Sequence, residues 1–292
     1  MKLLRRNEID PEKWDQKIGA SPIENIFCYS WYLDAVAENW SAIVSENYNT
    51  ILPLPFTHKL GIDQLYQPPF TRELDIFGND FIWEDVIPLL TQHFKALQFR
   101  NREQGILGEG EERKHQWIPL NPDEIKYSTN AKRLIKKAAK QFNVQEGQQA
   151  EQLIELFKEN VWSKVKMVST EDLTKLTGLM QKAISNGRGE LLKVNENGNL
   201  IAAAFFLKDK KRITYLKGAA TEEGKKSGAM YGIIDAAIKR YMDNYEMLDF
   251  GGSDVENVAI FYKKFGAHDR TYYNYTLDHL PLWYKTLKKI KR

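Results

Sequence analysis

The sequence predicts a mixed α+β protein built from two modules, and three observations lead to that prediction. The chain has 292 residues, which is long for one domain and comfortable for two of about 100 to 200 residues each. Apolar residues make up 42% and charged residues 28% of the chain, as in ordinary soluble globular proteins. Short β-rich runs alternate with amphipathic helical runs, a pattern typical of sheets flanked by helices.

The composition also narrows the class of protein. Cys28 is the only cysteine, which excludes an internal disulfide and favours a reducing, cytoplasmic location. There is no run of about 18 apolar residues, and the opening MKLLRRNEIDPEKWD turns acidic before a secretion signal could form, so we expect no transmembrane segment. The histidines are scattered, so no metal site is expected. A net charge of +3 is too small for a dedicated nucleic-acid binder.

The first module is expected to span residues 1–122. Two β-rich runs flank Glu46-Asn47-Tyr48-Asn49, whose asparagines tolerate turn conformations, so this region predicts a β-hairpin. Pro68-Pro69 cannot donate ladder hydrogen bonds, which predicts an edge or a loop. The helical WEDVIPLLTQHFKAL and the strand-like QFRNRE and KHQWIPL complete the layer.

The second module is expected to span residues 123–279. It opens with a basic amphipathic helix over 127–142, because residues such as Ser128 can cap it and its alanines, Leu134 and Ile135 form one stripe. Turn signals at 196–199 and 209–211 predict three antiparallel strands between 189 and 220. A helix, a strand, a short helix and a last strand follow. Residues 280–292 are expected to form a basic helix that packs back on the first module.

This order of elements resembles the core of GNAT acyltransferases, and its details resemble their FemABX-like, tandem-GNAT branch. The resemblance rests on NAKRLIKKAAKQFNV, similar to the basic linker helix of that branch, ITYLKGAAT, similar to its central strand, and SGAMYGIIDAAI and LDFGGSDVENVAIFYKKFGA, which follow. WYLDAVAENWSAIV and LYQPPFTRELDIFG resemble a degenerate first repeat. The resemblance implies tandem GNAT-like domains, each a mostly antiparallel twisted sheet flanked by helices.

A donor-binding loop is expected before the helix that begins near residue 229. Backbone N–H groups at a helix start bind phosphate groups, glycines permit close approach of a ligand, and lysines add positive charge. In GNAT enzymes that use acetyl-CoA this loop ends in Gly or Ala, where this chain has Met230. The candidate donor-binding residues of this loop are Gly224, Lys225, Lys226, Ser227, Gly228 and Ala229.

A second donor-binding group is expected where the strand LDFGG ends. In the GNAT pattern this strand splays from its neighbour, so that the arm of an acyl carrier pairs with exposed backbone groups as an added strand would. Gly251, Gly252 and Ser253 would keep that gap open. Asn257 is a further candidate contact, although it falls two positions later than the asparagine of the GNAT pattern.

Three side chains are candidates for catalysis. FYKKFGA matches the LYxKxGF-like sequence of GNAT enzymes, which implies that Tyr262 protonates the leaving thiolate or lies at the reacting carbonyl. Asp249 points either into the core or into the gap, and one residue of register decides which. Lys217, a charge within the strand LKGAA, must reach solvent or a partner and could face an anionic substrate group.

We expect an N-acyltransferase that moves an acyl group from acetyl-CoA or another acyl-CoA to an amine by direct attack, without a metal. One alternative is a FemABX-type peptidyltransferase of the bacterial cell envelope, which takes aminoacyl-tRNA as donor and a cell-wall precursor as acceptor. Another is a binding or scaffold protein whose repeats have lost their chemistry.

The expected acceptor is a small molecule or a cell-wall precursor. The basic clusters in 132–140 and 285–292 leave tRNA and a peripheral membrane surface open as partners, and the oligomeric state stays open.

Overall fold

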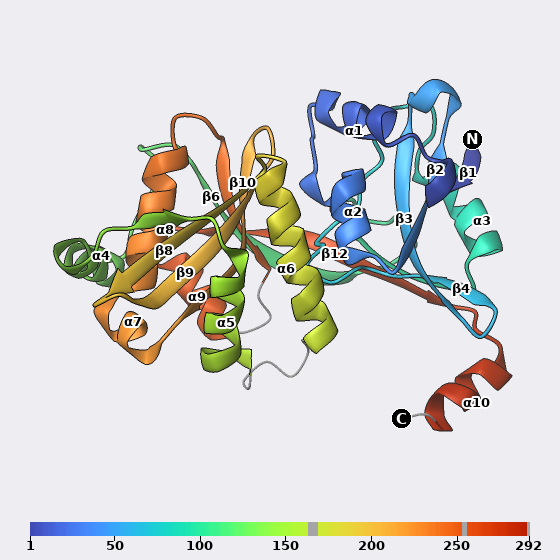
Figure 1. Cartoon of the computed structure of the whole chain (residues 1–292). Coiled ribbons are helices and arrows are strands. Elements are labelled where there is room, and N and C mark those ends of the chain that lie inside the picture. Colours follow the sequence, from blue (N-terminus) through green and yellow to red (C-terminus); the bar gives the residue numbers. More distant parts are fainter. Residues whose placement is uncertain (163–168, 253–255, 291–292) are drawn as a thin grey trace. The chain divides into compact units, whose positions relative to one another are not determined.

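The structure, a computed structural model, describes residues 1–162, 169–252 and 256–290 (Figure 1). The chain forms two compact units. Unit 1 comprises Met1–Arg113 and Thr271–Arg292, and unit 2 comprises Lys114–Arg270. The domain boundaries 1–122, 123–279 and 280–292 stay predictions.

Unit 1 is a mixed sheet with helices. Its strands follow the order β1-β2-β3-β4-β5-β12, and every described pair is antiparallel except β4 and β5. Its α-helices and strands are β1 (Lys2–Arg5), α1 (Pro11–Ala20), α2 (Ser30–Val36), β2 (Asn39–Val44), β3 (Ile51–Lys59), β4 (Ile62–Leu65), α3 (Trp83–His93), β5 (Ala96–Asn101), β12 (His268–Asp278) and α10 (Leu282–Ile290).

Local sequence explains why unit 1 takes this form. The carboxylate of Asp10 accepts hydrogen bonds from the first N–H groups of α1, and Pro11 has the backbone angle that a first helical residue needs. Asn47 has a φ of 54° in the turn between β2 and β3, which confirms the predicted hairpin. The core contains a stack of Trp83 on Phe99, whose ring centroids are 5.0 Å apart. α10 contacts β4 through a hydrogen bond from Gln64 to the Tyr284 hydroxyl.

Unit 2 contains six further strands, with helices on both faces. Its strands follow the order β6-β11-β10-β9-β8-β7, and the β10–β11 pair is parallel whereas the others are antiparallel. Its elements are β6 (Glu111–Pro119), α4 (Thr129–Gln141), β7 (Gln145–Gly147), α5 (Ala150–Asn160), α6 (Thr170–Ser185), β8 (Gly189–Glu196), β9 (Asn199–Lys208), β10 (Arg212–Ala220), α7 (Glu222–Ser227), α8 (Ala229–Tyr241), β11 (Met247–Gly252) and α9 (Glu256–Lys263).

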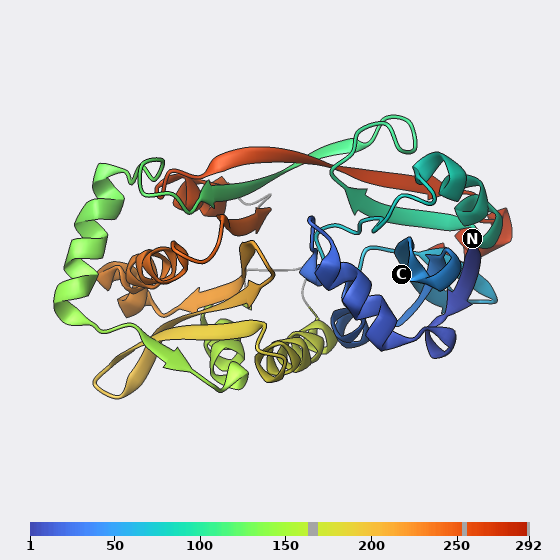
Figure 2. The ribbon, with the colours of Figure 1, turned by 90° about the horizontal axis from the view of Figure 1, so that it is seen from above.

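The expected helices and hairpins of unit 2 are present. Ser128 caps α4 by accepting a hydrogen bond from the N–H of Ala131. Asn197 and Gly198 both have positive φ in the tight turn between β8 and β9. Ala138 of α4 packs near Gly232 of α8, and Figure 2 shows the two helices next to each other. The predicted mixed α/β architecture, with mostly antiparallel sheets flanked by helices, is therefore confirmed.

The two faces of the unit 2 sheet carry different helices. The ring of Phe206 on β9 packs against Tyr241 of α8, so this face of β9 is covered by α8. Lys217 on β10 lies over the ring of Phe157 from α5, so the opposite face is covered by α5. Because side chains alternate along a strand, each residue of β10 and β11 can be assigned to one of these two faces.

Candidate active site

The strands β10 and β11 part within the sheet. Their parallel pairing runs from Arg212 with Met247 to Thr214 with Asp249, and no described residue continues it. β10 nevertheless stays paired with β9 as far as Ala220, and β11 stays paired with β6 as far as Gly252. The facing edges beyond Thr214 and Asp249 therefore have no strand partner in the described chain. This is the splayed geometry that the sequence predicted.

A bulge on β11 begins where the strands part. Asp249 pairs with Trp117 of β6 and Gly251 pairs with Gln116, so Phe250 is the extra residue. The carboxylate of Asp249 accepts a hydrogen bond of 2.8 Å from the N–H of Gly251, which has a φ of 74°. Such a φ is strained for a residue with a Cβ, so Gly251 is required by the bulge.

Asp249 is buried and ion-paired. Its carboxylate lies 3.7 Å from the guanidinium of Arg212, and the residue is 1% exposed. The register places it on the α5 face, in one row with Thr214. Asp249 therefore holds the bulge and the start of the parting in place.

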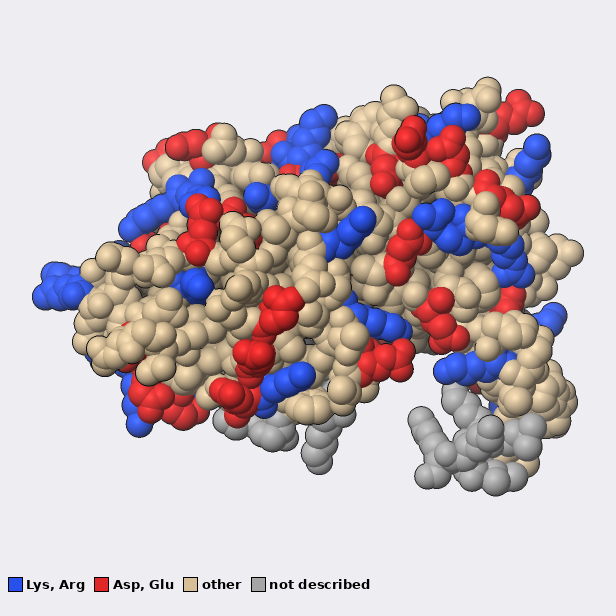
Figure 3. All heavy atoms as spheres, in the orientation of Figure 1, with Lys and Arg blue, Asp and Glu red and all other residues tan. Residues whose placement is uncertain are grey.

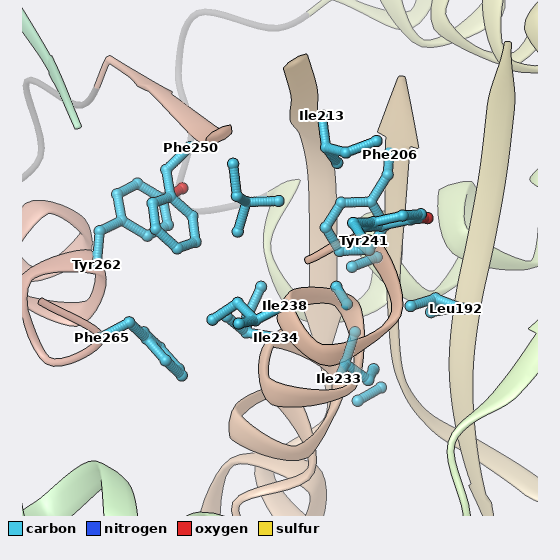
Figure 4. Packing of buried hydrophobic residues seen from close by; sticks show 14 of the residues in the cluster. Leu192, Phe206, Ile213, Ile233, Ile234, Ile238, Tyr241, Phe250, Tyr262 and Phe265 are labelled. Carbon is cyan, nitrogen blue, oxygen red and sulfur yellow. The ribbon is translucent and has the colours of Figure 1, made fainter. Parts of the chain in front are cut away.

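Tyr262 of α9 belongs to an aromatic cluster on the α8 face. Its ring stacks on Phe250 of β11 at a centroid distance of 4.5 Å, and it lies 5.9 Å from the ring of Tyr215 on β10. Figure 4 shows Phe250 and Tyr262 ring against ring, with Phe265 beside them. These rings come from both parted strands, so the cluster spans the parting on this face.

Burial raises the pKa of the Tyr262 hydroxyl well above its ordinary value, and the nearby Tyr215 and Asp249 raise it further. Tyr262 therefore keeps its proton at neutral pH. A phenol with a raised pKa is a weaker acid but still a hydrogen-bond donor. This environment favours hydrogen bonding by Tyr262 over full proton transfer.

Lys217 lies on the opposite face of the same parting. A bulge at Leu216 separates the Tyr215–Phe206 pair from the Lys217–Phe205 pair, so Tyr215 faces α8 while Lys217 faces α5. The Lys217 ammonium lies 3.8 Å from the centroid of the Phe157 ring. Burial lowers the pKa of Lys217 to about 8 because desolvation disfavours the charged amine. A large share of Lys217 is therefore neutral near pH 8, as a proton acceptor must be.

Thr214 is a candidate that the sequence did not reveal. It is the last residue of β10 that pairs with β11, and it is 4% exposed. Its Oγ1 atom is buried and has no hydrogen-bond partner in the described part of the chain. Buried hydroxyls are normally paired, so this one is available to a ligand. Only the strand register could have revealed it, since threonine is common in strands.

The expected donor loop forms a short helix. Residues 222–227 make up α7, capped by Thr221, and Gly228 with a φ of 81° joins α7 to α8. Gly224 is packed so tightly that a Cβ would lie 2.2 Å from the carbonyl oxygen of Ile201, and a Cβ on Gly228 would lie 3.1 Å from that of Leu134. These two glycines therefore permit close packing within the protein.

The other residues of this segment also have internal contacts. Lys225 forms an exposed ion pair with Glu222 at 2.6 Å, and the carbonyl of Lys226 accepts a hydrogen bond from Lys137 of α4. Ser227 donates its hydroxyl to the carbonyl of Glu223. Ala229 is the buried first residue of α8. The role of this segment in donor binding stays a prediction.

The structure brings some of the expected residues together and leaves others apart. Lys217, Asp249 and Gly251 lie at the parting of β10 and β11. Gly252 is the last residue of β11 and is exposed. Asn257 is exposed on the first turn of α9. Ser253 lies outside the described residues.

A basic surface lies on α4. Five of its side chains are exposed cations, and no ion pair is found for them among the described residues. Blue atoms mark this helix at the far left of Figure 3. The α4 basic surface consists of Lys132, Arg133, Lys136, Lys137 and Lys140.

No group of three or more His, Cys, Asp or Glu residues is arranged to hold a metal ion among the described residues. Among the helices of the described chain, none is both long and apolar enough to span a bilayer.

Comparison with known proteins agrees with this geometry. Residues 126–264 match the family model of the acetyltransferase (GNAT) domain, and no curated protein matches the chain. The crystal structure of FemX matches with a TM-score of 0.69 and 12% identity over 99% of both chains. L-PGS from Bacillus licheniformis matches with a TM-score of 0.57 and 13% identity over 96% of both. A tandem GNAT protein from the clavulanic acid biosynthesis pathway matches with a TM-score of 0.55 and 10% identity over 96% of this chain and 99% of that one.

The fold is thus the tandem-GNAT fold, and its second half carries a matched acetyltransferase domain. Residues 126–264 therefore form an acetyltransferase (GNAT) domain, which supports acyl transfer as the activity, and the chain shares its fold with FemX and with the tandem GNAT protein.

Proposed function

We propose that the chain is an N-acyltransferase that transfers an acyl group, with acetyl as the first candidate, from an acyl-CoA thioester to an amine. The observation that carries this proposal is the parting of β10 and β11 beyond Thr214 and Asp249. An extended pantetheine arm can hydrogen-bond to an unpaired strand edge as an added strand does. The match of residues 126–264 to the acetyltransferase (GNAT) domain model supports the transfer of an acyl group.

The step is a direct attack. The amine nitrogen bonds to the thioester carbonyl carbon, and neutral Lys217 accepts the proton that the nitrogen loses. The tetrahedral intermediate then collapses, the carbon–sulfur bond breaks, and the thiolate leaves with the electron pair. The Tyr262 hydroxyl, which stays protonated, donates a hydrogen bond to the sulfur, and solvent supplies the final proton. The Thr214 hydroxyl is a candidate donor to the carbonyl oxygen.

Lys217 is suited to the base role by its surroundings. Its amine is half-buried, it faces an aromatic ring at 3.8 Å, and its pKa of about 8 is close to working pH, where general bases act best. Asp249 supports this arrangement from the same face through its bonds to Gly251 and Arg212. Its part is therefore positioning.

The test is binding of acetyl-CoA to the full chain. A donor at a hundred times its dissociation constant is expected to add about 2.7 kcal/mol to the free energy of unfolding. Hydrogen exchange of the backbone N–H groups of residues 215–219 should slow at the same time, whereas exchange in β5 should not change. Millimolar acetyl-CoA that alters neither stability nor exchange would contradict the CoA donor.

A second candidate function is favoured by the α4 basic surface. This candidate is a FemABX-type transfer from aminoacyl-tRNA to a cell-wall precursor, with the same parting holding the ester-linked 3′ end. Five cations on one helix face suit a polyphosphate backbone. If this candidate holds, a donor tRNA binds with an affinity that falls steeply with salt, and Lys136→Glu together with Lys140→Glu weakens it. Lys239→Glu, on the neighbouring α8, serves as the matched control.

A further inference from the structure

The α4 basic surface lies next to the segment that joins α7 to α8. The Nζ atom of Lys137 donates a hydrogen bond of 2.9 Å to the carbonyl oxygen of Lys226, and a Cβ on Gly228 would lie 3.2 Å from that of Leu134. Arg133 lies four residues before Lys137, so the two exposed side chains are neighbours on one side of α4. Lys226 is exposed as well. Cations from two neighbouring elements therefore lie at the α7–α8 junction.

The charge at this junction is positive because of α4. The two carboxylates of α7 are balanced by its two lysines, and one such pair, Lys225 with Glu222, is joined at 2.6 Å. α4 has five cations and no carboxylate in its sequence, and no ion pair of Arg133 or Lys137 is found in the described part of the chain. Such a surface suits a ligand that carries several negative charges.

The parting of β10 and β11 leads toward the same junction. In the proposed step the thioester lies near Thr214 and Lys217, where the pairing of the two strands ends. The arm of the donor then follows the unpaired edge of β10 toward Ala220, because β11 pairs with β10 only in the other direction. Thr221 comes next and caps α7. The end of a donor that is remote from its thioester therefore emerges beside α7.

The segment 224–229 has few groups left for that end of the donor. Its two glycines are packed against Ile201 and Leu134, and its Lys225 is paired with Glu222. The positive charge at the junction thus comes mainly from α4, which is far from this segment in the sequence.

We propose that Arg133 and Lys137 of α4, together with Lys226, bind the phosphate groups of the CoA donor. This role rests on the proposed acyl-CoA function, since it concerns the far end of the arm that enters the parting. CoA carries a pyrophosphate and a 3′-phosphate, and Arg and Lys side chains form charge-assisted hydrogen bonds with such groups. α4 thereby favours a nucleotide-bearing donor over a thioester of bare pantetheine.

The test compares two donors by isothermal titration calorimetry of the full chain. S-acetylpantetheine has the arm and the thioester of acetyl-CoA but none of its phosphates. The chain should bind acetyl-CoA at least about tenfold more tightly than S-acetylpantetheine, and salt should weaken only the binding of acetyl-CoA. Arg133→Gln together with Lys137→Gln should weaken acetyl-CoA about fivefold to tenfold, because two charged contacts are lost, and should leave S-acetylpantetheine unchanged.

Two further variants serve as controls. Lys132→Gln removes an exposed cation of the same helix that lies about 140° round the helix axis from Lys137, and it should change either affinity by less than about twofold. Arg133→Lys together with Lys137→Arg keeps both charges and should keep most of the affinity for acetyl-CoA. Thermal unfolding of each variant checks that these exposed substitutions leave the fold intact.

The possible results separate this role from the function on which it rests. Full affinity for acetyl-CoA in the double Gln variant, or equal affinity of the unsubstituted chain for the two donors, would overturn the role of α4 while the acyl-CoA function stands. An equal loss in the Lys132 variant would overturn it too, since the effect would then be one of overall charge. Binding of neither donor would contradict the acyl-CoA function itself, and tRNA binding that the double Gln variant weakens would then assign the surface to RNA.

Discussion

Unit 1 and unit 2 each contain six strands in a matching order: four successive antiparallel strands, a fifth strand parallel to the fourth, and a sixth strand antiparallel to the fifth. In unit 1 the parallel pair is β4–β5 and the last strand is β12, and in unit 2 the pair is β10–β11 and the last strand is β6. Unit 1 takes its last strand, β12, from the far end of the sequence, whereas the last strand of unit 2, β6, is the first strand of its own segment. Such matching order is what two repeats of one fold would have.

The units differ next to the parallel pair. In unit 2 the edges beyond Thr214 and Asp249 have no strand partner in the described chain. In unit 1 the pairing ends at Leu65 with Leu97, but the edge of β5 beyond it is occupied by the chain itself. The side chain of Gln67 accepts a hydrogen bond of 2.9 Å from the N–H of Arg100, and the N–H of Leu74 donates to the carbonyl of Arg100 at 3.1 Å.

The difference explains how one repeat can keep a donor site while the other is closed. A carrier arm binds only where backbone groups are unpaired, and in unit 1 residues 67–74 already use those of Arg100. The chemistry is therefore expected in unit 2 alone, and unit 1 is expected to serve stability.

The largest expected effect is the loss of transfer activity when Lys217 is replaced. Lys217→Met should lower kcat/KM for acyl transfer by about a hundredfold or more, because removal of a general base typically costs this much. Lys193→Met is the matched control, since Lys193 is a half-buried strand lysine of the same sheet that bonds to Gln152 at 3.0 Å, away from the parting. Full activity in the Lys217 variant would exclude Lys217 as the general base.

A pair of substitutions compares the two units directly. Asn101 in unit 1 is 1% exposed and donates to the carbonyl of Leu74 at 2.7 Å. Asn101→Ala should therefore lower the free energy of unfolding by about 1 to 3 kcal/mol, measured with urea, and should leave donor affinity unchanged. Thr214→Val in unit 2 should leave stability nearly unchanged, because its hydroxyl has no partner in the described chain, and should weaken transfer several-fold. A loss of transfer in the Asn101 variant, or a loss of stability without a loss of transfer in the Thr214 variant, would contradict the assignment of stability to unit 1 and chemistry to unit 2.

The pH dependence of the rate should report the pKa of Lys217. With a pKa of about 8, the neutral fraction rises about tenfold between pH 7 and pH 9, so kcat/KM should rise by that factor and then level off. Stability should rise with pH over the range from about 8 to the ordinary pKa of lysine, because there the unfolded chain binds more protons than the folded one. A rate that is flat over this range would exclude Lys217 as the base.

The smallest effect is expected for Tyr262→Phe. The ring keeps its stack on Phe250, and only a hydrogen bond to the leaving sulfur is lost, so the rate should fall less than about tenfold. The measurement is the loss of rate caused by Tyr262→Phe with a thioester donor and with a donor that has a better leaving group. The loss should be smaller with the better leaving group. A loss of a hundredfold or more would indicate that Tyr262 transfers its proton fully to the leaving sulfur.

The sequence by itself determined the kinds of elements and much of their order. Ser128 predicted the start of α4, and Asn197-Gly198 predicted the β8–β9 turn, because caps and tight turns depend on a few neighbouring residues. Gly251 of LDFGG has the positive φ that the bulge between β11 and β6 needs, and the part of these glycines in donor binding stays a prediction.

The tertiary structure decided which groups meet. The bulge at Leu216 sets the face that Lys217 occupies, and the bulge at Phe250 does the same near Asp249; a shift of one residue reverses the direction of a side chain. Gly224 and Gly228 fitted a phosphate loop by composition, yet their space is filled by Ile201 and Leu134. Such contacts depend on residues far apart in the chain, which local patterns do not encode.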